Sequence, residues 1–406
     1  MKKLLFILLV FSVLKLNAAD IYVNNSGQAG TYTAIQIAIN AAAAGDRIFV
    51  SPYGLYTENL TIAKSLTITS AVANTRFSVV GTVTVTSAPN QDVIIIGGEF
   101  SGSLTGNTGA ATLTNKGTFT VSDCKFPGIT NGDYILSKLL FCEITNSAQI
   151  KHGLVIGSIL SSLTIPDGPN SLIGDTIKII GNILNYLEWN NNDCYYFISN
   201  DYITNSNGCA LRIKNNSFNS SINNIVSNNT IFGSVGGGSG ASFASIEILV
   251  PTNTNLNNIN FINNLINNNA GTSTIGCGSS PCSTVIGNIK HYYNSFSQSV
   301  TYVQSSGYGQ LIVGNTIYPS GGPQWTSVNG FGKPTVSILE NVGSPALQYY
   351  DIDLTRNDIG TFGGPYSIDN YWNTATGRAR IYDLNMPFEI WNGSTPSIKA
   401  EGIHIK

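Results

Sequence analysis

The chain has 406 residues, of which only 10% are charged, and its net charge is −2. Asn, Ser, Thr and 42 Gly supply most of the polarity, while 42% of the residues are hydrophobic. This composition excludes intrinsic disorder, which needs low hydrophobicity and high net charge, and it gives no reason to expect nucleic acid as a partner.

Residues 1–19 have the features of a secretory signal peptide. Lys2 and Lys3 form a charged start, residues 4–14 are apolar, and residues 17–19 offer a small-residue cleavage site. The apolar run is too short to span a bilayer comfortably. We therefore expect a secreted or cell-surface protein with no membrane span after the leader is removed, and an uncleaved anchor is the alternative.

The next segment predicts the start of a β-structure that is closed by a helix. Residues 21–23 read as a strand, and residues 32–44 place apolar residues at helical spacing before Gly45, a favourable helix end. From residue 46 onward the sequence predicts strand, turn and strand.

The sequence contains a G-x-Y-x-E motif, or phrase, at Gly54, Tyr56 and Glu58. It resembles a phrase near the start of pectin methylesterases and of many non-enzymatic relatives. The aspartates and the arginine of the later esterase motifs are not found in this sequence. We therefore interpret the three residues as part of the N-terminal cap.

Residues 80–330 repeat one short phrase: an apolar alternation, two Asn, a small residue and a large apolar residue. The phrase is clearest where Asn215-Asn216-Ser217-Phe218 is followed 13 residues later by Asn228-Asn229-Thr230-Ile231. A repeat this short cannot bury its own apolar face, so its copies must stack into a solenoid. The last apolar residue serves as an anchor for numbering, and the anchors are Phe100, Phe126, Ile144, Ile159, Leu184, Ile203, Phe218, Ile231, Ile266, Phe296 and Ile317.

Positions counted back from the anchor predict how the coils stack. Positions −5 and −7 are mostly apolar, as at Ile177 and Ile179, whereas positions −4 and −6 are mixed, which indicates strands with one inner face. Position −2 is mostly Asn, and Asn in register at a bend can stack its amides from coil to coil. The −2 residues are Gly98, Cys124, Cys142, Gly157, Asn182, Asp201, Asn216, Asn229, Asn264, Asn294 and Asn315.

This pattern resembles the asparagine ladder of right-handed parallel β-helices with the pectin-lyase-like fold. The resemblance implies an all-β solenoid over residues 20–330, with an N-terminal capping helix, followed by a C-terminal cap at residues 331–406. It does not imply one activity, because this fold hosts lyases, hydrolases, esterases, adhesins and proteins without known chemistry.

The six cysteines are candidates for pairing in a secreted chain. Two pairs share a repeat position, Cys124 with Cys142 at −2 and Cys194 with Cys209 at −9. Each pair is predicted to lie one rung apart, about 4.8 Å between strands, which suits either a disulfide or two stacked thiols. Cys277 and Cys282 bracket a short loop and predict a disulfide. Metal binding by cysteine is not expected.

The outward positions −6 and −4 carry a concentration of cations for a protein with 20 Lys and Arg. These residues, with one tyrosine, are Lys138, Lys178, Arg212, Lys214, Lys290 and Tyr292. They predict either a groove for a polyanionic glycan, such as a uronate polymer, or a solvated sheet that avoids edge pairing.

Catalytic residues are weakly indicated. Polygalacturonase-like enzymes use paired Asp with G-H-G and R-I-K phrases, and lyases of this fold use carboxylates that hold Ca²⁺ with an Arg or Lys base. Here an R-I-K phrase at 212–214 stands alone. The nearest constellation gives Asp193, Asp201, Arg212 and Lys214 as candidates, beside Glu188 and Trp189. Asp201 also suits a structural place in the ladder, and His291, at −5, is predicted to lie in the core.

From residue 331 the repeat disappears. The run from Ser344 through Asp351 and Asp353 to Pro365 resembles the S-P-A…D-x-D-G-x-x-R-x-D-x-G-A-x-G-G-P ending of many bacterial secreted β-helix proteins, with Leu354 where Gly is usual. We interpret it as a C-terminal cap in which Arg356 pairs with Asp353 or Asp358. A Ca²⁺ loop is the alternative, and its ligands would be Asp351, Asp353 and Asp358. No other cofactor is expected.

Two functional hypotheses follow. The first is a non-catalytic polysaccharide-binding, scaffolding or adhesive protein, favoured because no complete catalytic set is visible. The second is a polysaccharide lyase or glycoside hydrolase that acts on a uronate-type glycan. The sequence predicts no particular oligomeric state.

Overall fold

The computed structural model describes residues 18–86, 90–106, 117–132, 135–166, 176–190, 194–205, 208–214, 223–233, 245–249, 258–268, 275–277, 289–296, 311–314, 337–372, 379–385 and 399–404. Some predicted features lie outside these residues, namely positions 1–17 of the signal peptide, Asp193, Asn216, Phe218, the Cys277 side chain, Cys282, Asn315 and Ile317.

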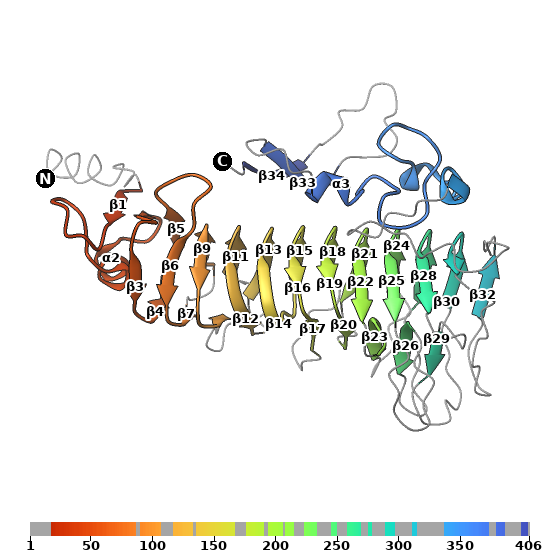
Figure 1. Ribbon diagram of the computed structural model, residues 1–406, viewed down its shortest axis with the longest axis horizontal. Coiled ribbons are helices and arrows are strands. Elements are labelled where there is room, and N and C mark those ends of the chain that lie inside the picture. The colour runs from red at the N-terminus through yellow and green to blue at the C-terminus, as the bar shows by residue number, and fades with distance from the viewer. Residues whose placement is uncertain are drawn as a thin grey trace, which may run out of the picture.

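Parallel strands stack along one axis, so the predicted parallel β-helix is confirmed (Figure 1). Among the described residues, one 13-stranded sheet, the first sheet, runs the length of the solenoid. Its strands are β1 (Asp20–Val23), β2 (Arg47–Val50), β5 (Leu66–Ser70), β8 (Asp92–Ile96), β11 (Gly117–Ser122), β13 (Ile135–Leu140), β15 (Gly153–Ile156), β18 (Thr176–Ile180), β21 (Tyr195–Ser199), β24 (Asn223–Ser227), β27 (Asn258–Ile262), β30 (Ile289–Tyr292) and β32 (Leu311–Gly314).

A 19-stranded sheet completes each coil with two columns of strands, column 2a and column 2b. Column 2a holds β3 (Leu55–Thr57), β6 (Phe77–Val80), β9 (Gly98–Phe100), β12 (Lys125–Asn131), β14 (Glu143–Gln149), β16 (Ile159–Leu160), β19 (Ile183–Leu184), β22 (Tyr202–Asn205), β25 (Thr230–Gly233), β28 (Leu265–Asn268) and β31 (Ser295–Phe296). Column 2b holds β4 (Leu60–Ile62), β7 (Val83–Val85), β10 (Leu104–Gly106), β17 (Leu163–Ile165), β20 (Leu187–Trp189), β23 (Leu211–Lys214), β26 (Ile246–Leu249) and β29 (Ile275–Cys277), and β12 and β14 run through both columns.

The N-terminal helix α2 covers the open end of the first coils. It spans Ile35–Ala41, shorter than the predicted 32–44, and buries Ile35, Ala38 and Ile39. The carboxylate of Glu58 accepts the N–H groups of Ile35 at 2.7 Å and Gln36 at 2.8 Å, which fixes the helix start. The interpretation of the G-x-Y-x-E phrase as cap structure is therefore confirmed.

The predicted ladder is confirmed as a continuous row of hydrogen bonds at the bend between the first sheet and column 2a. Each ladder residue donates its backbone N–H to the side chain of the next, for example Asp201 to Asn229 Oδ1 at 2.9 Å and Asn264 to Asn294 Oδ1 at 2.9 Å. The row is Gly98, Cys124, Cys142, Ser158, Asn182, Asp201, Asn229, Asn264 and Asn294. Bonded residues in this row are separated by 16 to 35 positions in the sequence.

The prediction of a separate coil at Asn216 and Phe218 is wrong. Asp201 bonds directly to Asn229, 28 residues later, and Ile203 pairs with Ile231, so no rung lies between them. The strand β23 that precedes Asn216 belongs to column 2b, where it pairs with β20 and β26. Its inward alternation matches that of a first-sheet strand because every strand in a coil has one inner face.

A second correction concerns one coil in which the register was set one residue too early. Ser158, not Gly157, occupies the ladder, and Leu160, not Ile159, is the inward anchor. Leu160 is 1% exposed, whereas Ile159 is 42% exposed on the outer face. A shift of one residue exchanges the two faces of a strand.

Two of the cysteine predictions can be compared with the structure. Cys124 does lie beside Cys142 in the ladder, and both are buried thiols without a disulfide. The predicted stacking of Cys194 on Cys209 is wrong, because Cys194 precedes β21 of the first sheet and Cys209 precedes β23 of column 2b. The error follows from the extra coil placed at Phe218.

The C-terminal region lies along the flank of the coils (Figure 1). It contains the 3₁₀ turns η1 (Ser337–Leu339) and η2 (Leu347–Tyr349), helix α3 (Asp369–Trp372) and an antiparallel pair, β33 (Ala379–Asn385) with β34 (Lys399–His404). Tyr371 packs on Leu140, Ile156 and Ile180, which point outward from the first sheet. Trp372 Nε1 donates to the carbonyl oxygen of Gly181 at 2.7 Å.

This flank is built by the residue before each ladder residue, which has a positive φ of 50° to 68°. These residues are Gly97, Asp123, Phe141, Gly157, Gly181, Asn200, Asn228, Asn263 and Tyr293. Asn and Gly tolerate this conformation better than other residues. The side chains of the three Asn point away from the core and bind the C-terminal region, as when Asn228 Nδ2 donates to Asn357 Oδ1 at 3.0 Å. The two Asn of the repeat phrase therefore have different roles.

Candidate functional site

The three catalytic candidates that the structure describes, Asp201, Arg212 and Lys214, do not form one site. Asp201 is fully buried in the ladder, where its Oδ1 atom accepts the backbone N–H and the side-chain Nδ2 of Asn182. Burial raises the pKa of its carboxyl to about 8. Arg212 lies on the outer face of column 2b, and Asp193 lies outside the described residues. Asp201 is therefore a structural residue of the ladder, which was the alternative to a catalytic role.

Arg212 and Lys214 meet Glu188 on the neighbouring rung. Lys214 Nζ lies 2.7 Å from Glu188 Oε1, and Arg212 Nη1 lies 3.7 Å from Glu188 Oε2. The hydroxyl of Tyr186 donates to Glu188 Oε2 at 2.5 Å. Trp189, which was grouped with them, points inward and stacks on Tyr196 with ring centroids 3.9 Å apart.

The protonation of this cluster favours an ion-pair network over a catalytic base. Burial opposes ionisation of Glu188, but hydrogen bonds from Lys214 and Tyr186 and the charge of Arg212 outweigh it and lower the pKa. Burial, with the hydrogen bond to Glu188, raises the pKa of Tyr186. Tyr186 therefore stays protonated at neutral pH, and both cations are already paired with a carboxylate.

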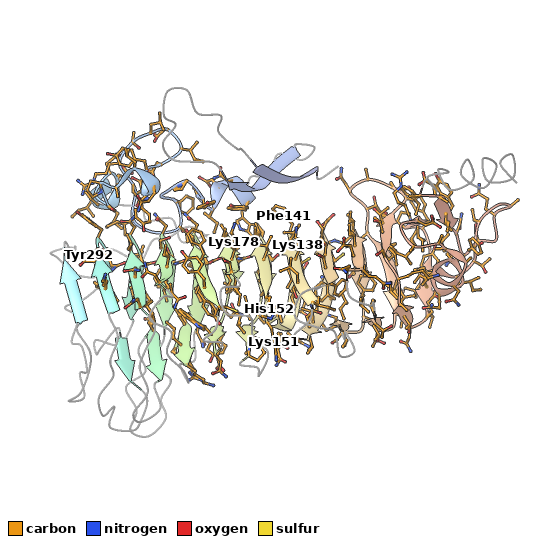
Figure 2. The ribbon with its side chains drawn as sticks, turned by 180° about the vertical axis from the view of Figure 1, so that it is seen from behind. Lys138, Phe141, Lys151, His152, Lys178 and Tyr292 are labelled. Atoms are coloured by element: carbon orange, nitrogen blue, oxygen red, sulfur yellow. The ribbon has the colours of Figure 1, made fainter. Side chains whose placement is uncertain are left out.

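The predicted basic strip is divided between two faces. Lys138, Lys178 and Lys290 share one outer row of the first sheet, with Tyr292 two residues beyond Lys290, whereas Arg212 and Lys214 lie on column 2b. Four rungs separate Lys178 from Lys290, roughly 19 Å at the usual strand spacing, which exceeds the Debye length of about 8 Å at physiological salt. Figure 2 shows Lys138, Lys178 and Tyr292 spread along the solenoid. The prediction of one continuous strip is therefore wrong.

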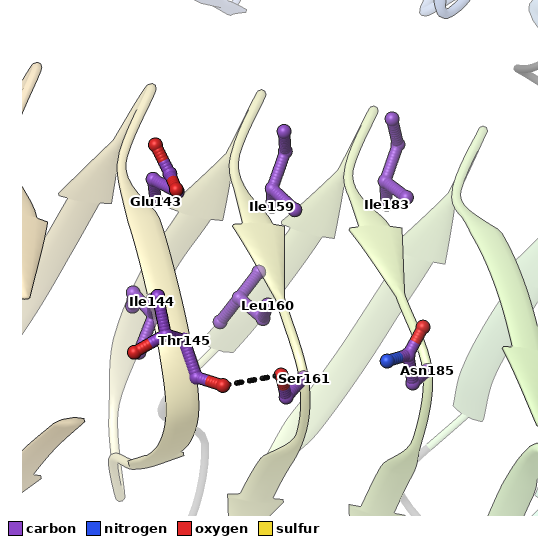
Figure 3. A pocket seen from close by; sticks show the side chains of 8 residues that line it. All are labelled: Glu143, Ile144, Thr145, Ile159, Leu160, Ser161, Ile183 and Asn185. Atoms are coloured by element: carbon purple, nitrogen blue, oxygen red, sulfur yellow. Dashed lines mark hydrogen bonds between the residues drawn. The ribbon is translucent and has the colours of Figure 1, made fainter. Parts of the chain in front are cut away.

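A groove of about 220 Å³ lies on the outer face of column 2a, over β14, β16 and β19 (Figure 3). One row of its side chains is Glu143, Ile159 and Ile183, in register on successive rungs. A second row of polar side chains runs beside it. The lining residues are Glu143, Ile144, Thr145, Ile159, Leu160, Ser161, Ile183 and Asn185.

The charges at one end of the groove are balanced. Glu143 Oε1 lies 3.1 Å from Lys125 Nζ, and Glu143 Oε2 lies 3.9 Å from Arg76 Nη1. Arg76 Nη2 also pairs with Asp123 Oδ1 at 2.8 Å. Two cations thus face two carboxylates, and the groove carries no net charge from these groups.

The outer row continues into an aromatic surface. Tyr202 follows Ile183 in register, and its ring packs edge-on against Phe232 with centroids 5.8 Å apart. Burial raises the pKa of the Tyr202 hydroxyl, so it remains neutral. The sequence pattern did not predict this groove because its numbering placed Ile159 on the inner face. The outward-facing aliphatic pair Ile159 and Ile183, read in the correct register, is the signal that would have found it.

The three aspartates proposed for Ca²⁺ bind groups of the C-terminal region itself, and Asp358 Oδ1 accepts the backbone N–H of Asn341 at 2.7 Å. Asp351 accepts the backbone N–H of Asp358 at 3.1 Å, and Asp353 accepts the hydroxyl of Thr355 at 2.6 Å. Within the described part of the chain, no group of three or more His, Cys, Asp or Glu is arranged to hold a metal ion. In the same part, Arg356 donates to the carbonyl oxygens of Gly343 at 2.7 Å and Val342 at 3.3 Å, in place of the predicted ion pair.

His291 lies in the core, as predicted. Its ring is fully buried and stacks on Phe261 with centroids 4.6 Å apart. Burial lowers its pKa to about 3, which keeps the imidazole neutral.

Comparison with family models, with curated proteins and with solved structures finds no match to this chain. No helix among the described residues is long and apolar enough to cross a bilayer.

Proposed function

We propose that this protein is a secreted or cell-surface β-helix that binds or scaffolds polysaccharide without cleaving it. The observation that carries the proposal is the open groove on column 2a, where the exposed Ile159 and the half-buried Ile183 lie beside hydroxyl, amide and carboxylate groups. Ligand sites commonly combine an apolar surface with a few polar groups that fix orientation. The predicted signal peptide at residues 1–19 supports an extracytoplasmic location.

Binding is favoured over cleavage by the state of the catalytic candidates. Hydrolysis of a glycosidic bond needs two carboxyl groups on opposite sides of one substrate. Asp201 is enclosed in the ladder, and Glu188 is held by Lys214, Arg212 and Tyr186. Neither group is available to activate water on a bound glycan.

The test is a glycan array on the mature protein combined with a lyase and hydrolase screen on the glycans that bind. The proposal expects saturable binding of at least one polysaccharide class, with no new reducing ends and no unsaturated uronate product. Failure to bind any glycan, or turnover of a uronate-type glycan, would overturn it.

A further inference from the structure

The outer row of column 2a is a continuous strip along the axis of the solenoid. Glu143, Ile159, Ile183 and Tyr202 occupy four successive rungs in direct register. At the usual strand spacing these rungs cover about 14 Å. The strip is therefore long enough for several units of an extended chain that lies parallel to the axis.

The strip and the polar row beside it match the two kinds of surface that a sugar ring presents. Ile159, Ile183 and the Tyr202 ring offer apolar area, and aromatic and aliphatic faces of this kind pack against C–H groups. Ser161 and Asn185 stand beside them on the second row and can hydrogen-bond hydroxyl groups. A pyranose ring has an apolar C–H face and a rim of hydroxyls, so it matches both rows.

The charges select among glycans. Lys125 and Arg76 are paired with Glu143 and Asp123, so neither cation is left uncompensated for a ligand carboxylate. A charged group that leaves water without gaining an ion pair costs free energy, and both cations here are already paired, so a uronate carboxylate on this strip would lose hydration without compensation. A neutral chain has no such cost.

We infer that the strip Glu143–Ile159–Ile183–Tyr202 binds a neutral oligosaccharide that runs along the solenoid axis. This inference rests on the proposed function and names its ligand class. It replaces the uronate polymer that the basic residues suggested, because those residues are divided between two faces.

The experiment measures binding of neutral oligosaccharides from glucan, mannan and xylan, and of uronate oligomers, to the mature full-length protein by titration calorimetry. Ile159→Ser removes apolar area inside the strip. Leu55→Ser is the matched control, because Leu55 is 59% exposed on the same outer row, five rungs away from Ile159. We expect Ile159→Ser to weaken binding of the neutral ligand about tenfold and Leu55→Ser to leave it unchanged.

Tyr202 gives a second pair of variants that does not depend on Ile159. Tyr202→Ala should weaken binding about tenfold, and Tyr202→Phe, which keeps the ring, should bind within about twofold of the wild type. Circular dichroism of each variant checks its fold. Absence of binding to every glycan refutes the proposed function. Neutral-glycan binding that neither the Ile159 nor the Tyr202 substitution weakens overturns only the present inference, and so does a preference for uronates.

Discussion

Asn182 donates its backbone N–H and its side-chain Nδ2 to one atom, Oδ1 of Asp201, at 2.7 and 2.8 Å. Asn229 does the same to Oδ1 of Asn264, and its Nδ2 also donates to the carbonyl oxygen of Ile198, one rung back. Asp201 has no amide, and its Oδ2 atom has no hydrogen-bond partner among the described residues. A protonated carboxyl would supply the missing donor, in agreement with the raised pKa of about 8.

The first prediction is that Asp201→Asn stabilises the protein at neutral and alkaline pH. The carboxyl titrates near 3.8 in an ordinary environment and near 8 in the fold, so between these values the folded state holds a proton that the unfolded state has lost. The contribution of Asp201 to the free energy of unfolding should therefore be largest below pH 4, fall as the pH rises, and level off above pH 8. Each pH unit in this window changes the free energy of unfolding by up to about 1.4 kcal/mol.

Urea unfolding of the wild type and of Asp201→Asn at several pH values measures this difference. The variant should lack the decline, because an amide does not titrate, and should exceed the wild type by several kcal/mol at pH 8. Parallel pH profiles for the two proteins would show that Asp201 is not held as a neutral acid.

Much of the fold could be predicted from the sequence because the ladder positions favour one residue type, Asn. Asn182, Asn229, Asn264 and Asn294 were placed correctly, since an amide stacked at a bend is one of few reasons for Asn to recur there. Coil length could not be predicted. It varies from 16 to 35 residues, and the strands on all three faces of a coil show the same alternation, so β23 was mistaken for a first-sheet strand.

The candidate site was missed for a related reason. Either Gly157 or Ser158 could occupy the bend, and either Ile159 or Leu160 could be the inward anchor. Local composition therefore does not fix the register. Only the pairing of Ile144 with Leu160 decides that Leu160 faces the core and Ile159 the solvent. The docking of the C-terminal region also depends on contacts between residues more than a hundred positions apart, which a repeat pattern does not contain.

The second prediction tests the ladder at Asn229. Asn229→Leu keeps similar volume but leaves the N–H of Asp201 and the carbonyl oxygen of Ile198 without partners. Each buried unsatisfied group costs about 1–3 kcal/mol, so the total loss should be several kcal/mol. Asn185→Leu, on an exposed position, should change stability by no more than about 0.5 kcal/mol. Equal losses in urea unfolding of the two variants would contradict the ladder.

The third prediction concerns the docked C-terminal region. Tyr371→Ala removes the ring that covers Leu140, Ile156 and Ile180, and should release residues 337–372 while the coils stay folded. Loss of a large buried aromatic side chain costs about 3–5 kcal/mol. Hydrogen exchange should rise in this segment and remain slow in the first sheet, whereas Tyr53→Ala, at an 82% exposed position, should change neither. Unchanged exchange in the segment would show that Tyr371 does not hold it.

The fourth prediction concerns Cys124 and Cys142. The thiol of Cys124 donates to the carbonyl oxygen of Ile95 and that of Cys142 to Val121, in the manner of a ladder amide. Burial raises the pKa of Cys142 to about 12, so its reactive thiolate is scarce at neutral pH. Alkylation mapped by mass spectrometry should leave both cysteines unmodified in the native protein and label both in urea without reductant. A Cys124–Cys142 bridged peptide in the non-reduced protein would contradict this.

The claim that the outside of the coils binds glycan without cleaving it has one direct test. The mature protein is titrated to saturation in a calorimeter with the neutral oligosaccharide that it binds most tightly. The mixture is kept for a day, and the mass of the recovered ligand is then measured by mass spectrometry. We predict a saturable binding curve that salt up to about 0.5 M changes little, because no net charge is neutralised, and a ligand recovered at its original mass. Recovery of shortened or unsaturated fragments would contradict the account, as would the absence of a binding curve.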